Sequence, residues 1–312
     1  MNSQIETWRV QAYTANVYHL AQQKGSRIGP YVRTEVFKGK TEYFDRLGLA
    51  TAQKKTARNS PTPNLDINHT RRAVTTAMYE WATLVDRKDK LQNIHDPENQ
   101  YAISARYALG RSMDDVIITA ALGSATTGET GSTTQALGNS QSVMAVAGGS
   151  GARMNVQALL KTKLLFDENE VEGPRYFIHS GTMLEAMLEQ TQVTSADYNT
   201  VRALVKGEID TFLGFKFIHS ERMPLVSATA NSGFTFDPTS GLYKSGGTAL
   251  AGTEVSGIAF VGDGLLLGKN EEAVGRIDER PDFSYSHQVY ASMDFGAVRM
   301  EEVKVVQVMS LP

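Results

Sequence analysis

The alternation of apolar and polar side chains is most regular in the last third of the chain. Apolar residues occupy every second position from Val289 to Ala297, and polar or small residues fill most of the positions between them. This alternation predicts a strand with one buried face. Valines between residues 303 and 308 predict a second strand. We therefore expect the chain to end in a sheet.

Helical spacing is strongest between residues 96 and 122. Asp96-Pro97-Glu98 combines a capping side chain, a proline at the first helical position and an acid at the positive helix end. Apolar residues recur at helical spacing as far as Leu122, and Gly123 then ends the helix. At about 1.5 Å per residue this helix is roughly 40 Å long, longer than most globular helices. We expect it to brace an elongated body.

The N-terminal region predicts an arm followed by a long hairpin. A capping box at Ser3 and Glu6 begins a short helix, and the arm extends over residues 1–35. Strand-forming residues then flank a polar centre within residues 36–89. This centre contains three basic residues and two prolines, which a core strand excludes: Lys54, Lys55, Arg58, Pro61 and Pro63. Such a hairpin cannot bury its own surface, so it needs a neighbour to lie on.

The middle of the chain predicts a compact α/β unit. Residues 124–142 are rich in Ser, Thr and Gly, which is typical of a surface loop. Helical and strand patterns then alternate, and beyond residue 227 strands and glycine-rich turns predominate. We expect helices over residues 156–166, 182–190 and 196–206, and strands over residues 175–179 and 211–218.

Composition excludes several classes of chemistry. The chain has 312 residues, of which 41% are hydrophobic and 21% charged, as in ordinary soluble proteins. It lacks the uninterrupted apolar segment of about 20 residues that spans a bilayer, and its first residues lack a signal-peptide core. The absence of cysteine excludes disulfides and thiolate sites. We expect a protein that stays in the cytoplasm where it is made, with no membrane contact.

A compact charged run occupies residues 276–282. It contains three carboxylates and two arginines but no histidine or cysteine that could work with them: Arg276, Asp278, Glu279, Arg280 and Asp282. Charges this close together are more easily satisfied by pairing than left free for proton transfer. Taken alone, the run is typical of a solvated turn.

One near-match to a catalytic motif keeps a hydrolase among the alternatives. Residues 148–152 narrowly miss the nucleophile elbow Gly-x-Ser-x-Gly, because Ala152 replaces the final glycine. A hydrolase would use Ser150, but we favour an ordinary glycine turn. Phosphate-loop and dinucleotide fingerprints are absent, and the six histidines lack the spacing of common metal sites. No catalytic residue, cofactor or metal is predicted.

Three segments together resemble the major capsid proteins of tailed bacteriophages. They are residues 207–218 followed by Glu221-Arg222, residues 276–282, and residues 289–308. The resemblance implies an α+β protein with the Hong Kong 97-type capsid fold. It implies an N-terminal arm (1–35), an extended β-hairpin loop (36–89), a peripheral domain with a long spine helix (90–145), an axial α/β domain (146–221) and a β-rich return to the peripheral domain (222–312).

The function implied by this resemblance is structural. Major capsid proteins self-assemble into pentamers and hexamers that form an icosahedral head shell enclosing phage double-stranded DNA. The expected location is the virion capsid, assembled in the host cytoplasm. The implied partners are other copies of the chain, a separate scaffolding protein, a portal, a possible decoration protein and, non-specifically, the packaged DNA. An encapsulin-type nanocompartment shell is the alternative closest to this assignment.

Charge distribution suggests which residues join neighbouring subunits. Residues 1–95 carry 15 basic and 8 acidic side chains, whereas the remainder carries 16 basic and 26 acidic ones. This asymmetry is open to three interpretations: docking of one copy's front on another's back, contact of the front with DNA, or a solvated charge bias. The candidates for intersubunit contact are Lys54, Lys55, Arg58, Arg276, Asp278, Glu279, Arg280 and Asp282.

Overall fold

The computed structural model divides the chain into two compact units. It describes residues 22–58, 62, 64–85, 98–147, 150–190, 211–223, 225–227, 234–237, 242–245, 253–270 and 274–311. The first unit comprises residues 1–26, 78–112 and 272–294, and the second comprises residues 27–77, 113–271 and 295–312. Each unit is considered by itself below.

The largest sheet belongs to the second unit. Its strands follow the order β11-β12-β10-β16-β20-β7-β15-β14, with β13 also paired to β16. Strands β10 and β12 are parallel, whereas β16 is antiparallel to both β10 and β20. The bounds are β7 (Ser142–Met144), β10 (Arg175–His179), β11 (Thr211–Phe212), β12 (Phe215–His219), β13 (Leu225–Ser227), β14 (Phe234–Asp237), β15 (Leu242–Ser245), β16 (Thr253–Val261) and β20 (Val305–Ser310).

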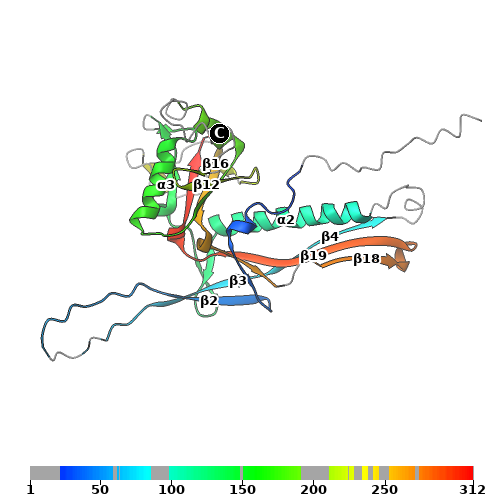
Figure 1. The fold of residues 1–312 in the computed structure, drawn as a ribbon, viewed down its shortest axis with the longest axis horizontal. Coiled ribbons are helices and arrows are strands. Elements are labelled where there is room, and N and C mark those ends of the chain that lie inside the picture. Colours follow the sequence, from blue (N-terminus) through cyan, green and yellow to red (C-terminus); the bar gives the residue numbers. More distant parts are fainter. Residues whose placement is uncertain are drawn as a thin grey trace, which may run out of the picture. The chain divides into compact units, whose positions relative to one another are not determined.

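Two helices accompany this sheet, and Figure 1 labels α3 beside β12 and β16. Helix α3 (Val156–Glu168) begins where the Asn155 side chain accepts a hydrogen bond from the amide of Ala158 at 2.8 Å. Helix α4 (Gly181–Leu188) has Ser180 as its cap. Both helices confirm the helices predicted over residues 156–166 and 182–190. In each, a capping side chain precedes an amphipathic run.

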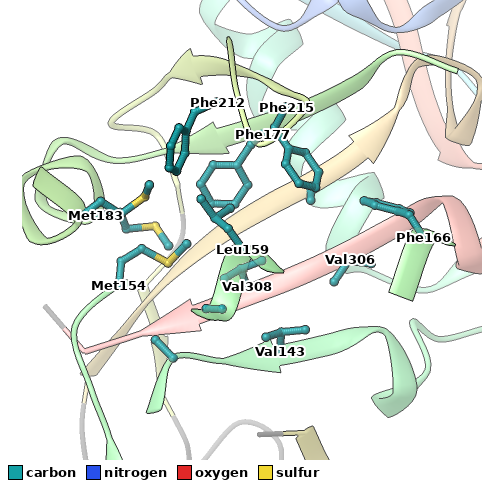
Figure 2. Packing of buried hydrophobic residues seen from close by; sticks show 14 of the residues in the cluster. Val143, Met154, Leu159, Phe166, Phe177, Met183, Phe212, Phe215, Val306 and Val308 are labelled. Carbon is teal, nitrogen blue, oxygen red and sulfur yellow. The ribbon is translucent and has the colours of Figure 1, made fainter. Parts of the chain in front are cut away.

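Aromatic, aliphatic and methionine side chains fill the core between sheet and helices. Figure 2 shows the rings of Phe177, Phe212 and Phe215 gathered together, with Met154 and Met183 beside them. The valines of β20 are fully buried, as the run of apolar residues near the C-terminus predicts. This core fixes the strands whose ends carry the polar residues described below.

A second sheet of this unit has the order β2-β3-β5-β6. Strands β2 (Thr41–Leu47) and β3 (His69–Thr75) form a hairpin that is paired from Thr41 with Thr75 to Leu47 with His69. The paired strands of this hairpin therefore cover only part of residues 36–89. The flanking strands have other partners: β1 (Arg33–Val36) pairs with β17 (Leu265–Lys269), and β4 (Ala77–Val85) pairs with β19 (Ser286–Arg299).

The predicted surface loop over residues 124–142 is largely exposed, but it is not free of strands as a loop would be. The segment contains β5 (Ala125–Thr127), β6 (Thr133–Gln135) and the 3-10 turn η3 (Asn139–Gln141), and β7 begins at its end. Strand β5 joins the hairpin through the pairing of Thr127 with Arg72. Thr and Ser are compatible with short edge strands as well as with loops, so composition alone does not separate the two.

Most other element predictions that fall on described residues are confirmed. Helix α2 (Glu98–Leu122) ends as predicted, and the amide of Gly123 donates to the carbonyl of Thr119 at 2.8 Å. The predicted strand over 211–218 is instead a tight hairpin, because Leu213 and Gly214 have positive φ values of 52° and 87°. The capping residues Asp96 and Pro97, the helix that starts at Ser3, and the helix over residues 196–206 lie outside the described residues.

The first unit contains the hairpin of β18 (Val274–Arg280) and the first part of β19. Pairing runs from Val274 with Ser292 to Arg280 with Ser286. Most of the charged run is therefore a strand, and the predicted turn is confined to the 3-10 turn η6 (Pro281–Phe283) and the two residues after it. Alternating charge satisfies strand periodicity as readily as it satisfies a solvated turn.

Candidate assembly surfaces

The loop that closes the β2–β3 hairpin carries exposed leucines. Pairing continues one step beyond the strands, where the amide of Gly48 donates to the carbonyl of Asn68 at 2.7 Å. Leu47, Leu49 and Leu65 expose 70%, 93% and 41% of their surface. Apolar side chains that protrude from a hairpin loop are candidates for a surface that another molecule covers.

The predicted basic residues lie in the same loop. Lys54, Lys55 and Arg58 are exposed, and none of them forms an ion pair with a residue that the structure describes. The structure thus brings these three charges together with the exposed leucines on one segment. Their free amine and guanidinium groups can meet carboxylates or phosphates.

The outward face of the hairpin is stiffened by an ion pair. Nε of Arg71 donates to Oδ1 of Asp45 at 2.6 Å, and the guanidinium lies 5.6 Å from the centre of the Tyr43 ring. The hydrogen bond from Arg71 lowers the pKa of Asp45. Because both side chains are exposed, the pair orients the strands and contributes little stability.

The inward face of the hairpin carries an arginine cluster, which we define as Arg46, Arg72 and Arg299 around Glu302. The carboxylate of Glu302 accepts a hydrogen bond from Nη2 of Arg72, lies 3.7 Å from Nε of Arg299 and lies 3.9 Å from Nη1 of Arg46. The Arg72 and Arg299 side chains are only 1% and 0% exposed. Sequence analysis missed this cluster, because its members lie on different strands and turns.

Arg299 also ties together three backbone segments. Its Nη1 donates to the carbonyls of Ala121 and Gly123 at 2.8 and 2.7 Å, and its Nη2 donates to the carbonyl of Gln135 at 2.9 Å. The first two carbonyls lie at the C-terminal end of α2, where a positive charge is favourable. Burial nevertheless lowers the pKa of Arg299. The residue therefore anchors the helix end to the β5–β6 region.

Some charged side chains of residues 276–282 form an ion pair with each other, and the others do not. Arg280 donates from Nε and Nη2 to both oxygens of Asp282, at 2.9 and 2.6 Å. This hydrogen bonding lowers the pKa of Asp282 and raises that of Arg280. Arg276, Asp278 and Glu279 are exposed and form no ion pair with any described residue. The expected pairing within the run thus occurs for two of its five charged residues.

The turn after Arg280 presents aromatic side chains on a constrained backbone. Phe283 and Tyr285 expose 49% and 57% of their surface, and the Arg280 guanidinium lies 5.3 Å from the centre of the Phe283 ring. Ser284 and Tyr285 have positive φ values of 53° and 57°, although neither is glycine. Such backbone costs energy that the surrounding contacts must offset. Sequence analysis predicted a turn here, but it missed the left-handed backbone and the exposed rings, because the segment lacks the usual Asn-Gly signal.

A polar junction forms where β10 and β12 end side by side. His179 pairs with His219 in the strand register, and their ring centres are 5.7 Å apart. Nε2 of His219 lies 2.7 Å from Oε1 of Glu221. The same carboxylate oxygen accepts a hydrogen bond from the amide of Gly181 at 2.7 Å. Burial lowers the pKa of His179, and the Gly181 amide is the main cause of the lowered pKa of Glu221.

The described residues offer little support for catalysis. Ser150 lies in β9 (Ser150–Gly151), which pairs antiparallel with β8 (Val146–Ala147), so the strand does not lead directly into a helix as a nucleophile elbow requires. Gly148 and Gly149 lie outside the described residues. Within the described residues, no group of His, Asp or Glu is arranged to hold a metal. No helix in the described ranges has the length and apolar content needed to cross a membrane.

A family profile and several solved structures relate this chain to phage capsids. A family profile described as phage capsid protein matches residues 5–311. The capsid structure of the cyanophage P-SCSP1u is 14% identical with a TM-score of 0.72, covering 98% of this chain and 94% of that chain. The capsid of Ralstonia phage GP4 is 8% identical with a TM-score of 0.74, covering 97% and 95%. A search of curated proteins finds no match.

The same fold occurs in a structure from Mycobacterium phage Che8, which is 15% identical with a TM-score of 0.67 and covers 96% of this chain and 97% of that chain. The mixed sheets, the long α2 and the central α/β core are those of the Hong Kong 97-type capsid fold. The family match extends over nearly the whole chain, and it places the protein in the virion as a structural component. The chain belongs to the phage capsid protein family and forms the icosahedral shell of the virion.

Proposed function

We propose that copies of this chain form pentamers and hexamers that close into a head shell around double-stranded DNA. The hairpin loop of one copy lies across a neighbouring copy. Closed symmetry satisfies every repeated contact, so many modest contacts add up to a stable container. The protein acts without catalysis and without a cofactor.

The exposed leucines of the hairpin loop carry this proposal. Leu47, Leu49 and Leu65 project from a segment that has no described core around it. Burying one leucine side chain contributes about 1.5–3 kcal/mol, so even partial burial of three gives a useful docking energy per subunit. The basic residues Lys54 and Lys55 beside them favour an acidic surface on the neighbour.

The resemblance to phage capsid proteins supports a division of the chain into regions. Residues 1–35 act as an arm, 36–89 as the extended loop, 90–145 and 222–312 as the peripheral parts and 146–221 as the axial domain. A separate scaffolding protein directs closure, a portal admits the DNA, and a decoration protein is a further possible partner. Contact with the packaged DNA is electrostatic and independent of sequence.

Loop replacement tests the docking role. Replacing residues 50–65 with a short Gly-Ser turn and changing Leu47 and Leu49 to serine leaves the chain folded, because these residues make no part of the described core, but it prevents shells from forming. Circular dichroism reports folding, and sedimentation with negative-stain microscopy reports shells. The matched control changes Lys54, Lys55 and Arg58 to glutamine and keeps the loop length. Normal shells from the loop-replaced variant would rule out the docking role.

A further inference from the structure

The arginine cluster holds more positive charge than its own residues neutralise. Among the described residues, three guanidinium groups share the carboxylate of Glu302. The neighbouring acids are engaged elsewhere: Glu301 contacts Lys304 at 3.4 Å, and Asp45 pairs with Arg71 on the outward face of the hairpin. Within the described part of the chain, the cluster therefore has three positive charges against one carboxylate.

Several donors of the cluster are also unsatisfied. Nε of Arg46, Nη1 of Arg72 and Nε of Arg299 are buried and make no hydrogen bond to any described residue. Nη1 of Arg46 and Nε of Arg72 both donate to the carbonyl of Met300, so the two arginines share one backbone acceptor. A buried charged donor without an acceptor is costly, and guanidinium groups match planar oxyanions best.

The cluster has one accessible side. The side chains of Arg46 and Glu302 are 19% and 24% exposed, whereas those of Arg72 and Arg299 are closed off from solvent. An incoming group must therefore approach Arg46, because Arg72 and Arg299 are not exposed. Burial lowers the pKa of Arg72, as expected for a cation without enough compensating charge.

We propose that an acidic side chain of a second copy of this chain inserts beside Arg46 and completes the arginine cluster. This inference rests on the proposed function, since it requires subunits to meet. Charge complementarity supports a second copy as the source: residues 96–312 carry 26 acidic against 16 basic side chains. The chain also offers suitable acids. Asp278 and Glu279 are exposed, and neither forms an ion pair with a described residue. The contact links the base of one subunit's hairpin to its neighbour.

The substitution Arg46→Gln tests the inference, because it should affect the unassembled chain and the assembled shell differently. In the unassembled full-length chain it removes a surplus charge, so the melting temperature stays the same or rises. In the shell it removes the partner of an incoming carboxylate, so the yield of shells falls by about tenfold or more. Arg71→Gln is the matched control, because it breaks an exposed pair on the adjacent strand and leaves the yield unchanged.

Inorganic phosphate distinguishes a second copy from a free anion as the source of the charge. At constant ionic strength, phosphate raises the melting temperature of the unassembled wild-type chain but not that of Arg46→Gln. Assembled wild-type shells do not respond, because the protein carboxylate already fills the cluster. Shells that respond to phosphate as strongly as the unassembled chain overturn the assignment to a second copy.

The remaining outcomes separate this inference from the function on which it rests. If Arg46→Gln lowers the melting temperature of the unassembled chain and leaves the shell yield unchanged, the cluster is merely structural and the inference is wrong. If the wild-type chain forms no shells with its scaffold, the proposed function itself fails. Wild-type shells with a normal Arg46→Gln yield contradict the inference alone.

Discussion

Arginine meets carboxylate in two very different surroundings in this chain. Arg280 and Asp282 form an exposed, complete pair within two residues of sequence. Arg72 and Glu302, 230 residues apart, meet in a largely buried cluster that has an excess of arginine. The exposed pair orients a hairpin tip, whereas the buried cluster joins the β2–β3 hairpin, the end of α2 and the segment between β19 and β20. Location rather than chemistry decides which pair the fold depends on.

The strongest test of this difference removes the shared carboxylate. Glu302→Gln leaves three arginines around a neutral amide, and we expect it to reduce the free energy of unfolding by about 3–5 kcal/mol. Asp282→Asn makes the same chemical change at the exposed pair and leaves unfolding unaffected within error. Urea denaturation of both variants measures the contrast. Equal effects would show that burial does not distinguish the two sites.

A second comparison removes one arginine from the buried cluster and one from the exposed pair. Arg299→Met leaves the carbonyls of Ala121, Gly123 and Gln135 without their donor, while it also removes surplus positive charge. We expect a net loss of about 2–3 kcal/mol in the free energy of unfolding. Arg280→Met at the exposed pair is the control and leaves urea denaturation unchanged. A neutral Arg299→Met would mean that other donors can replace the guanidinium.

His179 extends the comparison to a buried ionisable group that has no carboxylate hydrogen bond of its own. Because burial lowers its folded-state pKa below the unfolded value of about 6.5, the unfolded chain binds the proton more readily. Stability therefore falls as the pH drops below about 6.5, by at most about 1.4 kcal/mol per pH unit for this one proton.

The variant His179→Phe keeps a ring between Phe177 and Phe217 and removes the titration. We expect a flatter dependence of the unfolding free energy on pH between about 6.5 and 5. The acid limb that persists belongs to carboxylates with lowered pKa values, among them Glu221, whose contribution to stability is lost at still lower pH. The same pH dependence in wild type and variant would exclude His179 as its source.

The smallest expected effect concerns the exposed hairpin tip. Tyr285→Gly relieves a left-handed backbone that glycine adopts freely, and we expect a gain of about 1 kcal/mol in the free energy of unfolding. Phe283→Ala keeps the backbone and removes a neighbouring exposed ring, so it separates the two contributions. Destabilisation by Tyr285→Gly would mean that the exposed tyrosine ring contributes more than the strained backbone costs.

Local signals identified most of the elements that positioned the candidate surfaces. The amphipathic runs of α3 and α4 and the glycine after α2 are local signals, because helical periodicity and capping are decided within a few residues. The strands inside residues 124–142 were missed because strand pairing depends on distant partners. The contact between Arg280 and Asp282 was foreseeable, since the two residues are neighbours on one chain segment.

The sequence by itself determined the family, the long helix, the alternating C-terminal strands, the absence of thiol chemistry and the basic hairpin loop. Only the tertiary structure brought Arg46, Arg72 and Arg299 to one carboxylate and placed His179 beside His219. The physical reason is that periodicity and capping act over a few residues, whereas burial and charge balance depend on segments that meet only after the chain has folded.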